Sequence, residues 1–191
     1  MPDSAPLHTR GSAALLTLPN LITLARLCAV PLAFWLVIDH EMAAAFGLFV
    51  AAGASDAVDG WLARRAGSTR LGAMLDPVAD KALLVTMYVT LAAVGALPTW
   101  LATLVVFRDM VIVGGVVVLG LLGQPVAIRP LFVSKVNTML QIVLVAFTLF
   151  LAGFGFDAPN ARVAALALAW AVAATTLASG VAYVWRVAHG R

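Results

Sequence analysis

The sequence predicts an all-α polytopic membrane protein with six transmembrane helices, and two observations lead to that prediction. Of the 191 residues, 63% are hydrophobic and only 11% are charged, and the mean hydropathy is +1.02. A soluble domain carries about 25% charged residues, so this composition is that of an integral membrane protein. The apolar residues also fall into six runs, each near the ~20 residues that a helix needs to cross a bilayer.

Short polar or helix-breaking segments separate the six runs. A polar turn at residues 39–41 follows the first run, and Gly95 and Pro98 bound the end of the third. Residues 1–18 are expected to form a flexible or interfacial lead-in, and residues 19–191 a single six-helix transmembrane domain. The predicted spans are residues 20–38, 42–62, 75–94, 99–122, 134–151 and 163–187.

Lysine and arginine residues are distributed unevenly between the two ends of the predicted spans. One end has only Arg162, beside Asp39, Glu41 and Asp157, whereas the other has Arg10, Arg64, Arg65, Arg70, Arg129, Lys135, Arg186 and Arg191. By the positive-inside rule, the basic end and both termini are cytoplasmic, so we expect a multi-pass protein of the inner (cytoplasmic) membrane. No basic stripe with aromatic residues is present, so nucleic-acid binding is not expected.

Four aspartates lie between long apolar runs in residues 55–81. On a helix, Asp56 and Asp59 (i, i+3) share a face, and so do Asp76 and Asp80 (i, i+4). Two helices joined by a short loop lie antiparallel, so both pairs can point into one pocket. Four carboxylates in a low-dielectric site cannot all stay ionised without cations, and ligands that are all oxygen indicate Mg²⁺, Mn²⁺ or Ca²⁺ rather than zinc.

Small residues accompany these aspartates on their helix faces. Gly60 and Ala63 lie on the face of the first pair, and Gly72, Ala73 and Ala79 flank the second pair. Small side chains leave room for a bulky ligand against the backbone. Tight packing of membrane helices also explains the small residues, but it does not explain the aspartates.

The same residues resemble the signature of the CDP-alcohol phosphotransferases (CDP-alcohol phosphatidyltransferases), Asp-x-x-Asp-Gly-x-x-Ala-Arg and then Gly-x-x-x-Asp-x-x-x-Asp. Asp56, Asp59, Gly60, Ala63, Arg64, Gly72, Asp76 and Asp80 fill every fixed position, and the intervening gap of seven residues is at the short end for the family. The resemblance implies the fold of that family, a divalent-metal-dependent transfer from a CDP-linked lipid, and a homodimer.

The resemblance also implies roles for individual residues. Asp56, Asp59 and Asp76 would bind two divalent cations, Mg²⁺ or Mn²⁺, and Asp80 would complete the metal site and act as general base on the acceptor hydroxyl. The CDP-diacylglycerol donor would be held by Asn20, Thr23, Gly60, Ala63, Arg64, Thr69, Arg70 and Gly72. For Asn20, a helix cap after Pro19 is the alternative role.

Further polar residues in the apolar helices are candidates for binding the acceptor and its phosphate: Arg26, Arg108, Arg129, Ser134, Lys135, Asn137 and Gln141. Arg26 either snorkels to the interface or pairs with a phosphate or an aspartate. Arg108 either binds a phosphate or belongs to a buried ion pair. Since neighbours on a helix point in different directions, we expect that Arg108 and Asp109 are not partners. Ser134, Asn137 and Gln141 share one face.

Three further segments resemble the cardiolipin synthases of the mitochondrial type: residues 107–111, residues 132–138 with Gln141, and residues 175–179. The resemblance implies CDP-diacylglycerol as donor and phosphatidylglycerol as acceptor, with cardiolipin and CMP as products. The alternative is a phosphatidylglycerophosphate synthase, which uses glycerol 3-phosphate. Those enzymes usually carry an Arg-Glu pair and further arginines in the fourth helix, where this chain has Arg108 and Asp109.

A cation transporter is the alternative from another functional class. It predicts charges at the midplane on several helices and access from both sides. The four aspartates instead cluster near one predicted face, and the opposite loops have no matching polar group. A scaffold protein would have no reason to keep the eight signature positions filled.

Overall fold

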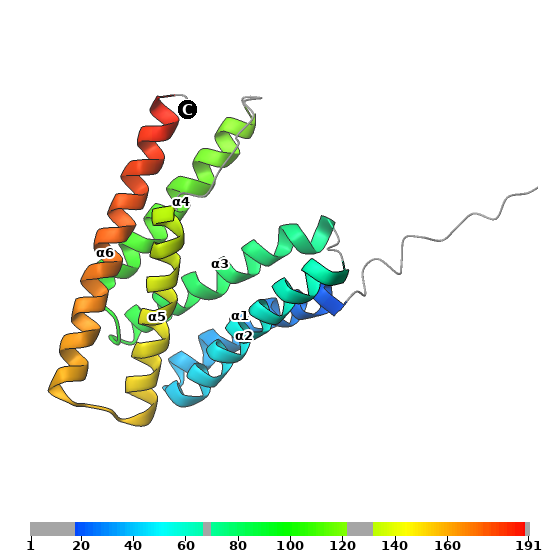
Figure 1. Cartoon of the computed structure of the whole chain (residues 1–191). Coiled ribbons are helices and arrows are strands. Elements are labelled where there is room, and N and C mark those ends of the chain that lie inside the picture. The colour runs from blue at the N-terminus through cyan, green and yellow to red at the C-terminus, as the bar shows by residue number, and fades with distance from the viewer. Residues whose placement is uncertain (1–17, 67–69, 122–131, 190–191) are drawn as a thin grey trace, which may run out of the picture.

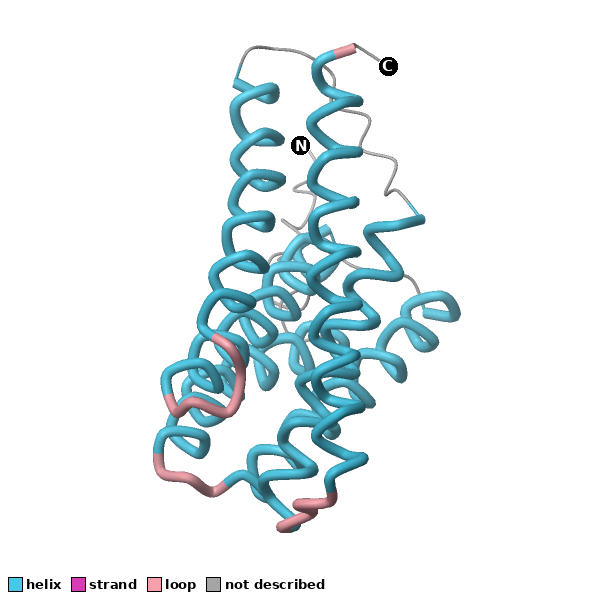
Figure 2. Tube along the Cα trace, turned by 90° about the vertical axis from the view of Figure 1, so that its left-hand side faces the viewer, coloured by secondary structure: helices cyan, strands magenta, loops and turns pink. Residues whose placement is uncertain are grey.

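The computed structural model describes residues 18–66, 70–121 and 132–189, with the backbone alone at residues 18–21, 56–66, 70–77 and a few positions near helix ends. This described part consists of helices and contains no strand (Figure 1; Figure 2), which confirms the all-α prediction. The helices are α1 (Leu18–Ile38), α2 (Met42–Ala66), α3 (Arg70–Ala93), α4 (Thr99–Leu121), α5 (Phe132–Phe154) and α6 (Pro159–Ala188).

The observed helices agree in order with the predicted spans but extend further at their polar ends. α2 continues to Ala66 and α3 begins at Arg70, several residues beyond the predicted boundaries at 62 and 75. The predicted boundaries follow hydropathy, which ends where charged residues begin, whereas a helix continues through charged residues that favour helical backbone. α6 begins at Pro159, where the missing N–H group costs no helical hydrogen bond.

Short connections join the helices at the lower end of the molecule in Figure 1 and Figure 2. The polar turn predicted at residues 39–41 follows α1, and its His40 has φ 62°; Gly95 and Gly155 also have positive φ values, 75° and 68°. Arg162, in the first turn of α6, donates from Nε to Asp157 in the α5–α6 connection at 2.5 Å. This hydrogen bond and the charge of Arg162 hold the pKa of the exposed Asp157 below its usual value.

The six helices form two groups in space. α1 packs against α2 and α3, and α6 packs against α4 and α5; contacts of α2 with α5 and of α3 with α4 and α5 join the groups. In Figure 1, α4, α5 and α6 run side by side, and α1, α2 and α3 lean away from them together. The hydrophobic core lies where the groups meet, and its fully buried side chains include Val37, Met87, Tyr88, Leu91, Leu101, Val105, Leu144, Leu149 and Val172.

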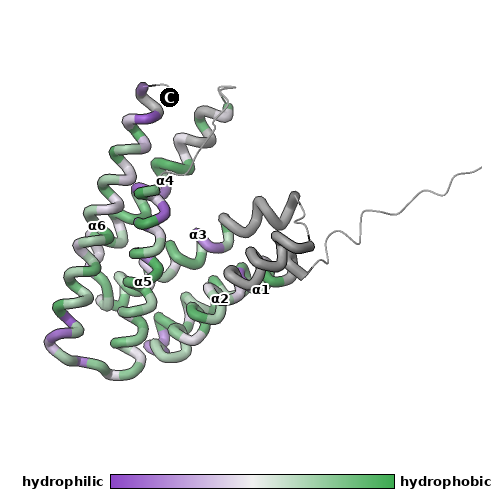
Figure 3. The backbone as a smooth tube through the Cα atoms, in the orientation of Figure 1, coloured by the Kyte–Doolittle hydropathy of each residue, from purple (hydrophilic) through white to green (hydrophobic). Residues whose placement is uncertain are grey.

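The outside of the helices is strongly apolar. Large hydrophobic side chains such as Trp35, Phe107, Met110 and Trp170 are exposed, and Figure 3 shows hydrophobic residues over most of the described chain. Two helices of the described part, Phe132–Phe154 and Pro159–Arg186, are long and apolar enough to cross a membrane. The other four predicted spans stay predictions.

Helix α5 makes its closest approach to α2 at Gly153. A Cβ atom on Gly153 would lie 2.6 Å from the backbone nitrogen of Ala43 and 2.7 Å from its Cα. Both are backbone atoms, which cannot turn away as a flexible side chain can. Only glycine therefore allows α5 to pack against the first turn of α2 at this distance.

We expect Gly153→Ala to lower the melting temperature in detergent, because separating α5 from α2 costs about 1–3 kcal/mol of packing free energy. Gly114→Ala in α4 is the matched control, since a Cβ there would meet nothing within 4 Å. Thermal unfolding of both variants provides the measurement. Equal melting temperatures for Gly153→Ala and the parent protein would contradict this account of the α2–α5 contact.

Candidate functional site

Asp80 is the predicted metal-binding aspartate whose side chain the structure describes. Its Oδ1 atom accepts a hydrogen bond of 2.6 Å from Nη1 of Arg26, which joins α3 to α1. The Arg26 side chain is 2% exposed and the Asp80 side chain is 45% exposed. Of the roles open to Arg26, snorkelling to the interface is thus wrong and pairing with an aspartate is confirmed. The carboxylate of Asp80 lies at the edge of the bundle with one oxygen held in place.

The backbone around the other three aspartates has the predicted form. Asp56 and Asp59 lie within α2, Asp76 lies within α3 with Asp80, and only residues 67–69 separate the two helices. The side chains of Asp56, Asp59 and Asp76 lie outside the described part, so the convergence of four carboxylates stays a prediction. Also outside the described part are the side-chain contacts at Asn20, Gly60, Ala63, Arg64, Thr69, Arg70, Gly72 and Arg129. Thr23, the remaining donor candidate, is buried on α1.

A cluster of three charged residues begins directly after Asp80. Nζ of Lys81 on α3 lies 2.5 Å from Oδ2 of Asp109 on α4, and Oδ1 of Asp109 lies 3.0 Å from Nη1 of Arg108. The expectation that Arg108 and Asp109 are not partners is therefore wrong. Helical geometry separates their Cβ directions, but the arginine side chain is long enough to reach the neighbouring carboxylate. We call Lys81, Asp109 and Arg108 the charged cluster.

Arg108 connects this charged cluster to two more helices. Its Nη2 atom donates to Oγ of Ser134 on α5 at 2.7 Å and to Oγ of Ser179 on α6. The side chain is almost fully buried, and its Nε atom has no hydrogen-bond partner among the described residues. A buried guanidinium needs both a counter-charge and partners for its N–H groups. Asp109, Ser134 and Ser179 provide them, so Arg108 does form the buried ion pair that the sequence left open.

The polar face predicted on α5 points into the bundle. Asn137 and Gln141 are fully buried, and Oδ1 of Asn137 accepts hydrogen bonds from Thr175 at 2.9 Å and Thr176 at 2.8 Å on α6. Lys135, one residue after Ser134, is exposed instead. Within the described part, Nδ2 of Asn137 and both amide atoms of Gln141 have no hydrogen-bond partner. This polar face of α5 therefore binds α5 to α6, in addition to any role toward a ligand.

These contacts form a polar belt that crosses five helices. It runs from the Arg26–Asp80 pair (α1–α3) through the charged cluster (α3–α4) to Ser134, Ser179, Asn137, Thr175 and Thr176 (α5–α6). Figure 3 shows hydrophilic segments on α3 and where α4 and α5 overlap in this view, within a largely hydrophobic bundle. The predicted catalytic residue, Asp80, directly precedes Lys81 of the charged cluster on α3.

Sequence reasoning did not predict roles for Lys81, Asp109 and Ser179. A signal was present for Lys81, because a lysine inside a long helix of an apolar bundle needs a counter-ion as much as Arg108 does. Asp109 was the nearest acidic candidate on the following helix. The hydroxyl of Ser179 carries no such signal, since serine is common in membrane helices for packing alone.

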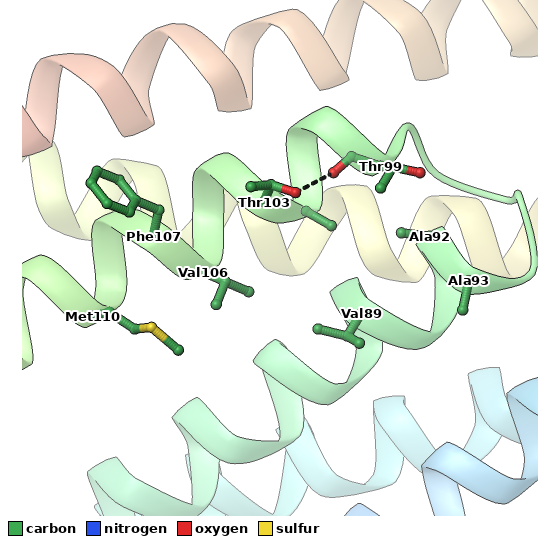
Figure 4. A pocket seen from close by; sticks show the side chains of 9 residues that line it. Val89, Ala92, Ala93, Thr99, Thr103, Val106, Phe107 and Met110 are labelled. Atoms are coloured by element: carbon green, nitrogen blue, oxygen red, sulfur yellow. Dashed lines mark hydrogen bonds between the residues drawn. The ribbon is translucent and has the colours of Figure 1, made fainter.

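An apolar groove of about 670 Å³ lies between α3 and α4 (Figure 4). Its wall consists of Val89, Ala92, Ala93, Thr99, Ala102, Thr103, Val106, Phe107 and Met110. The hydroxyl of Thr103 donates to the carbonyl oxygen of Thr99 within α4 at 3.0 Å. None of the residues in this wall is charged, so the groove offers no charged group to a ligand. The wall of this groove has no group that would bind a phosphate.

Comparison with known proteins assigns the family. Residues 16–178 match the family model of the CDP-alcohol phosphatidyltransferases, and the chain belongs to this family. It is 36% identical over 193 residues to a rice protein (Oryza sativa subsp. japonica), the chloroplastic CDP-diacylglycerol–glycerol-3-phosphate 3-phosphatidyltransferase 1, with 92% of this chain and 58% of the relative aligned.

Two further relatives are named cardiolipin synthase (CMP-forming). The human protein is 31% identical over 185 residues, covering 87% of this chain and 60% of the relative. The Streptomyces coelicolor protein is 34% identical over 183 residues, covering 90% and 83%. The chain spans about three fifths of the length of the rice and human relatives. Relatives whose names describe two different enzymes thus resemble this chain to a similar degree.

We expect Ser179→Ala to destabilise the protein by about 1–3 kcal/mol, because it leaves a buried N–H group of Arg108 with one partner fewer. Ser55→Ala is the matched control, since the Ser55 hydroxyl makes only an exposed hydrogen bond within α2, to the carbonyl oxygen of Ala51. Thermal unfolding in detergent measures both. If the two variants melt at the same temperature, Ser179 does not support Arg108.

Proposed function

We propose that this chain is a membrane-embedded cardiolipin synthase that transfers the phosphatidyl group from CDP-diacylglycerol to phosphatidylglycerol, giving cardiolipin and CMP. The observation that carries the proposal is the half-exposed carboxylate of Asp80 on α3, which directly precedes Lys81 of the charged cluster in the sequence, in a chain of this family. The carboxylate suits proton transfer from a hydroxyl, and the cluster suits recognition of an acceptor that carries a phosphate. Two of the relatives described above bear the corresponding name.

The second candidate is a phosphatidylglycerophosphate synthase, with glycerol 3-phosphate as acceptor. The rice relative supports it, because its name specifies glycerol 3-phosphate and its identity to this chain is 36%. Both candidates share the donor and the chemistry at phosphorus. They differ only in the molecule whose hydroxyl attacks.

A pair of divalent cations, Mg²⁺ or Mn²⁺, fits the donor set of the proposed site. Asp56, Asp59, Asp76 and Asp80 offer oxygen ligands only, and the helical backbone of α2 and α3 keeps each pair on one face. Bound cations would neutralise the pyrophosphate and make the acceptor hydroxyl more acidic. The half-exposed Asp80 carboxylate is accessible to such an ion, as this assignment requires.

The residues of the chain itself then have separate tasks. Asp80 accepts the proton of the acceptor hydroxyl while a new bond forms between the hydroxyl oxygen and the phosphorus of the phosphatidyl group. The bond from that phosphorus to the oxygen of CMP breaks, and CMP leaves with the electron pair. Arg26 holds Oδ1 of Asp80 and so orients the carboxylate, and it stays a candidate for binding the acceptor phosphate.

The acceptor phosphate is assigned to the basic side of the polar belt. Arg108, with a buried Nε atom that has no described partner, and the exposed Lys135 are the described cations for it, and Arg129 is the third candidate. Ser134, Asn137 and Gln141 form the inner side of the same region. The donor remains assigned to Asn20, Thr23 and the signature residues Gly60, Ala63, Arg64, Thr69, Arg70 and Gly72.

The proposal includes six transmembrane helices in the inner (cytoplasmic) membrane, with both termini and the site on the cytoplasmic side. This placement suits a water-soluble nucleotide that leaves to the cytosol while the lipid tails stay in the bilayer. The apolar outer surface supports it. The homodimer implied by the family resemblance stays a prediction.

We expect Asp80→Asn to reduce CMP release by about 100-fold or more, the usual contribution of a general base. CMP should still bind in the presence of the cation, because the other three aspartates remain. Asp157→Asn is the matched control, since Asp157 is an exposed aspartate in the α5–α6 connection. Turnover that persists in Asp80→Asn would remove the general-base role.

Acceptor profiling tests the proposed reaction itself. Purified protein in vesicles that contain CDP-diacylglycerol is expected to release CMP when phosphatidylglycerol and Mg²⁺ or Mn²⁺ are supplied, and to produce cardiolipin. Chelation of the cation should stop the release. Activity with glycerol 3-phosphate but not with phosphatidylglycerol would replace the first candidate by the second, and no CMP release with either acceptor would contradict both.

A further inference from the structure

Asp109 occupies an unusual electrostatic position, because one buried carboxylate serves two cations. Oδ2 lies 2.5 Å from Nζ of Lys81, and Oδ1 lies 3.0 Å from Nη1 of Arg108. The side chain of Asp109 is 6% exposed and that of Lys81 is 32% exposed. The charged cluster therefore carries a formal charge of +1 rather than +2, and it is open to the outside only at Lys81, beside Asp80.

We propose that Asp109 is a specificity-determining residue that limits the positive charge offered to the acceptor and so favours a phosphodiester over a phosphomonoester. The inference rests on the proposed function, in which the charged cluster faces the acceptor phosphate. A phosphodiester such as phosphatidylglycerol carries one negative charge. A phosphomonoester such as glycerol 3-phosphate carries close to two near neutral pH.

The argument follows from the charges and from the burial of the cluster. Coulomb energy is proportional to the product of the charges, so removing the charge of Asp109 strengthens the attraction of a dianion twice as much as that of a monoanion. Asp109 and Arg108 are nearly inaccessible to solvent, so water and salt screen them weakly. The neighbouring Arg26–Asp80 pair has no net charge, and Lys135 is exposed; neither changes when Asp109 is replaced.

A purely structural role for Asp109 makes a different prediction. If the carboxylate only stabilises two buried cations, its replacement lowers stability and weakens all ligands alike. The ratio of affinities for a dianionic and a monoanionic phosphate then stays constant. That ratio is the quantity to measure, because a general loss of stability or activity does not alter it.

The test uses the full chain in detergent with two water-soluble probes, glycerol 3-phosphate and the phosphodiester glycerophosphoglycerol. Ligand-dependent shifts of the melting temperature give both dissociation constants without any need for turnover. In Asp109→Asn, we expect glycerol 3-phosphate to bind about tenfold more tightly and the phosphodiester about threefold more tightly, as the charge product requires. Asp109→Glu keeps the charge and should keep the ratio of the parent protein.

Lys81→Gln provides the opposite change and covers the case in which Asp109→Asn does not fold. It makes the cluster neutral, so the dianion should lose about tenfold in affinity and the phosphodiester about threefold. A ratio that stays within about twofold of the parent value in either variant would overturn the proposal, and so would the absence of any binding of both probes. Because binding is measured apart from CMP release, a failure of the proposed reaction remains distinguishable from a failure of this inference.

Discussion

The way in which α4, α5 and α6 meet depends on the burial of the Arg108 guanidinium. A cation inside an apolar bundle is costly unless a counter-charge and hydrogen-bond acceptors surround it. Asp109 supplies the charge, and Ser134 and Ser179 supply the acceptors from two other helices. Arg108 therefore links α4 to α5 and α6, in addition to hydrophobic packing and the hydrogen bonds of Asn137.

Two further ion pairs join α3 to its neighbours near the proposed reaction site. Lys81 ties α3 to α4 through Asp109, and its neighbour Asp80 ties α3 to α1 through Arg26. The residue proposed as general base and the lysine that binds α4 are thus neighbours on α3. A rigid framework of this kind suits a transfer in which positioning and charge stabilisation contribute more than a protein nucleophile does.

Hydropathy and residue spacing predicted much of this structure. The helix order followed from the lengths of the apolar runs, and the polar face of α5 followed from helical periodicity. The long polar ends of α2 and α3 did not follow, because hydropathy ends before the helix does. The Arg108–Asp109 pair was missed for a different reason: helical spacing describes where side chains start, and a long flexible side chain can end beside its neighbour. Lys81 found its partner on another helix, which periodicity within one helix cannot reveal.

The signature and the residues proposed to bind the acceptor are different parts of the chain. This explains why sequence similarity to the relatives does not identify the acceptor. The eight signature positions lie on α2 and α3. The proposed function assigns them to the metal and the CDP-linked donor, which both candidate reactions share. In the proposed function the acceptor is recognised elsewhere. Outside the signature, Lys81, Arg108 and Asp109 lie where α3 meets α4, and Lys135 lies near the start of α5. A single carboxylate there changes the local charge without altering the signature. Relatives that bear the names of different enzymes accordingly share about a third of the aligned residues with this chain.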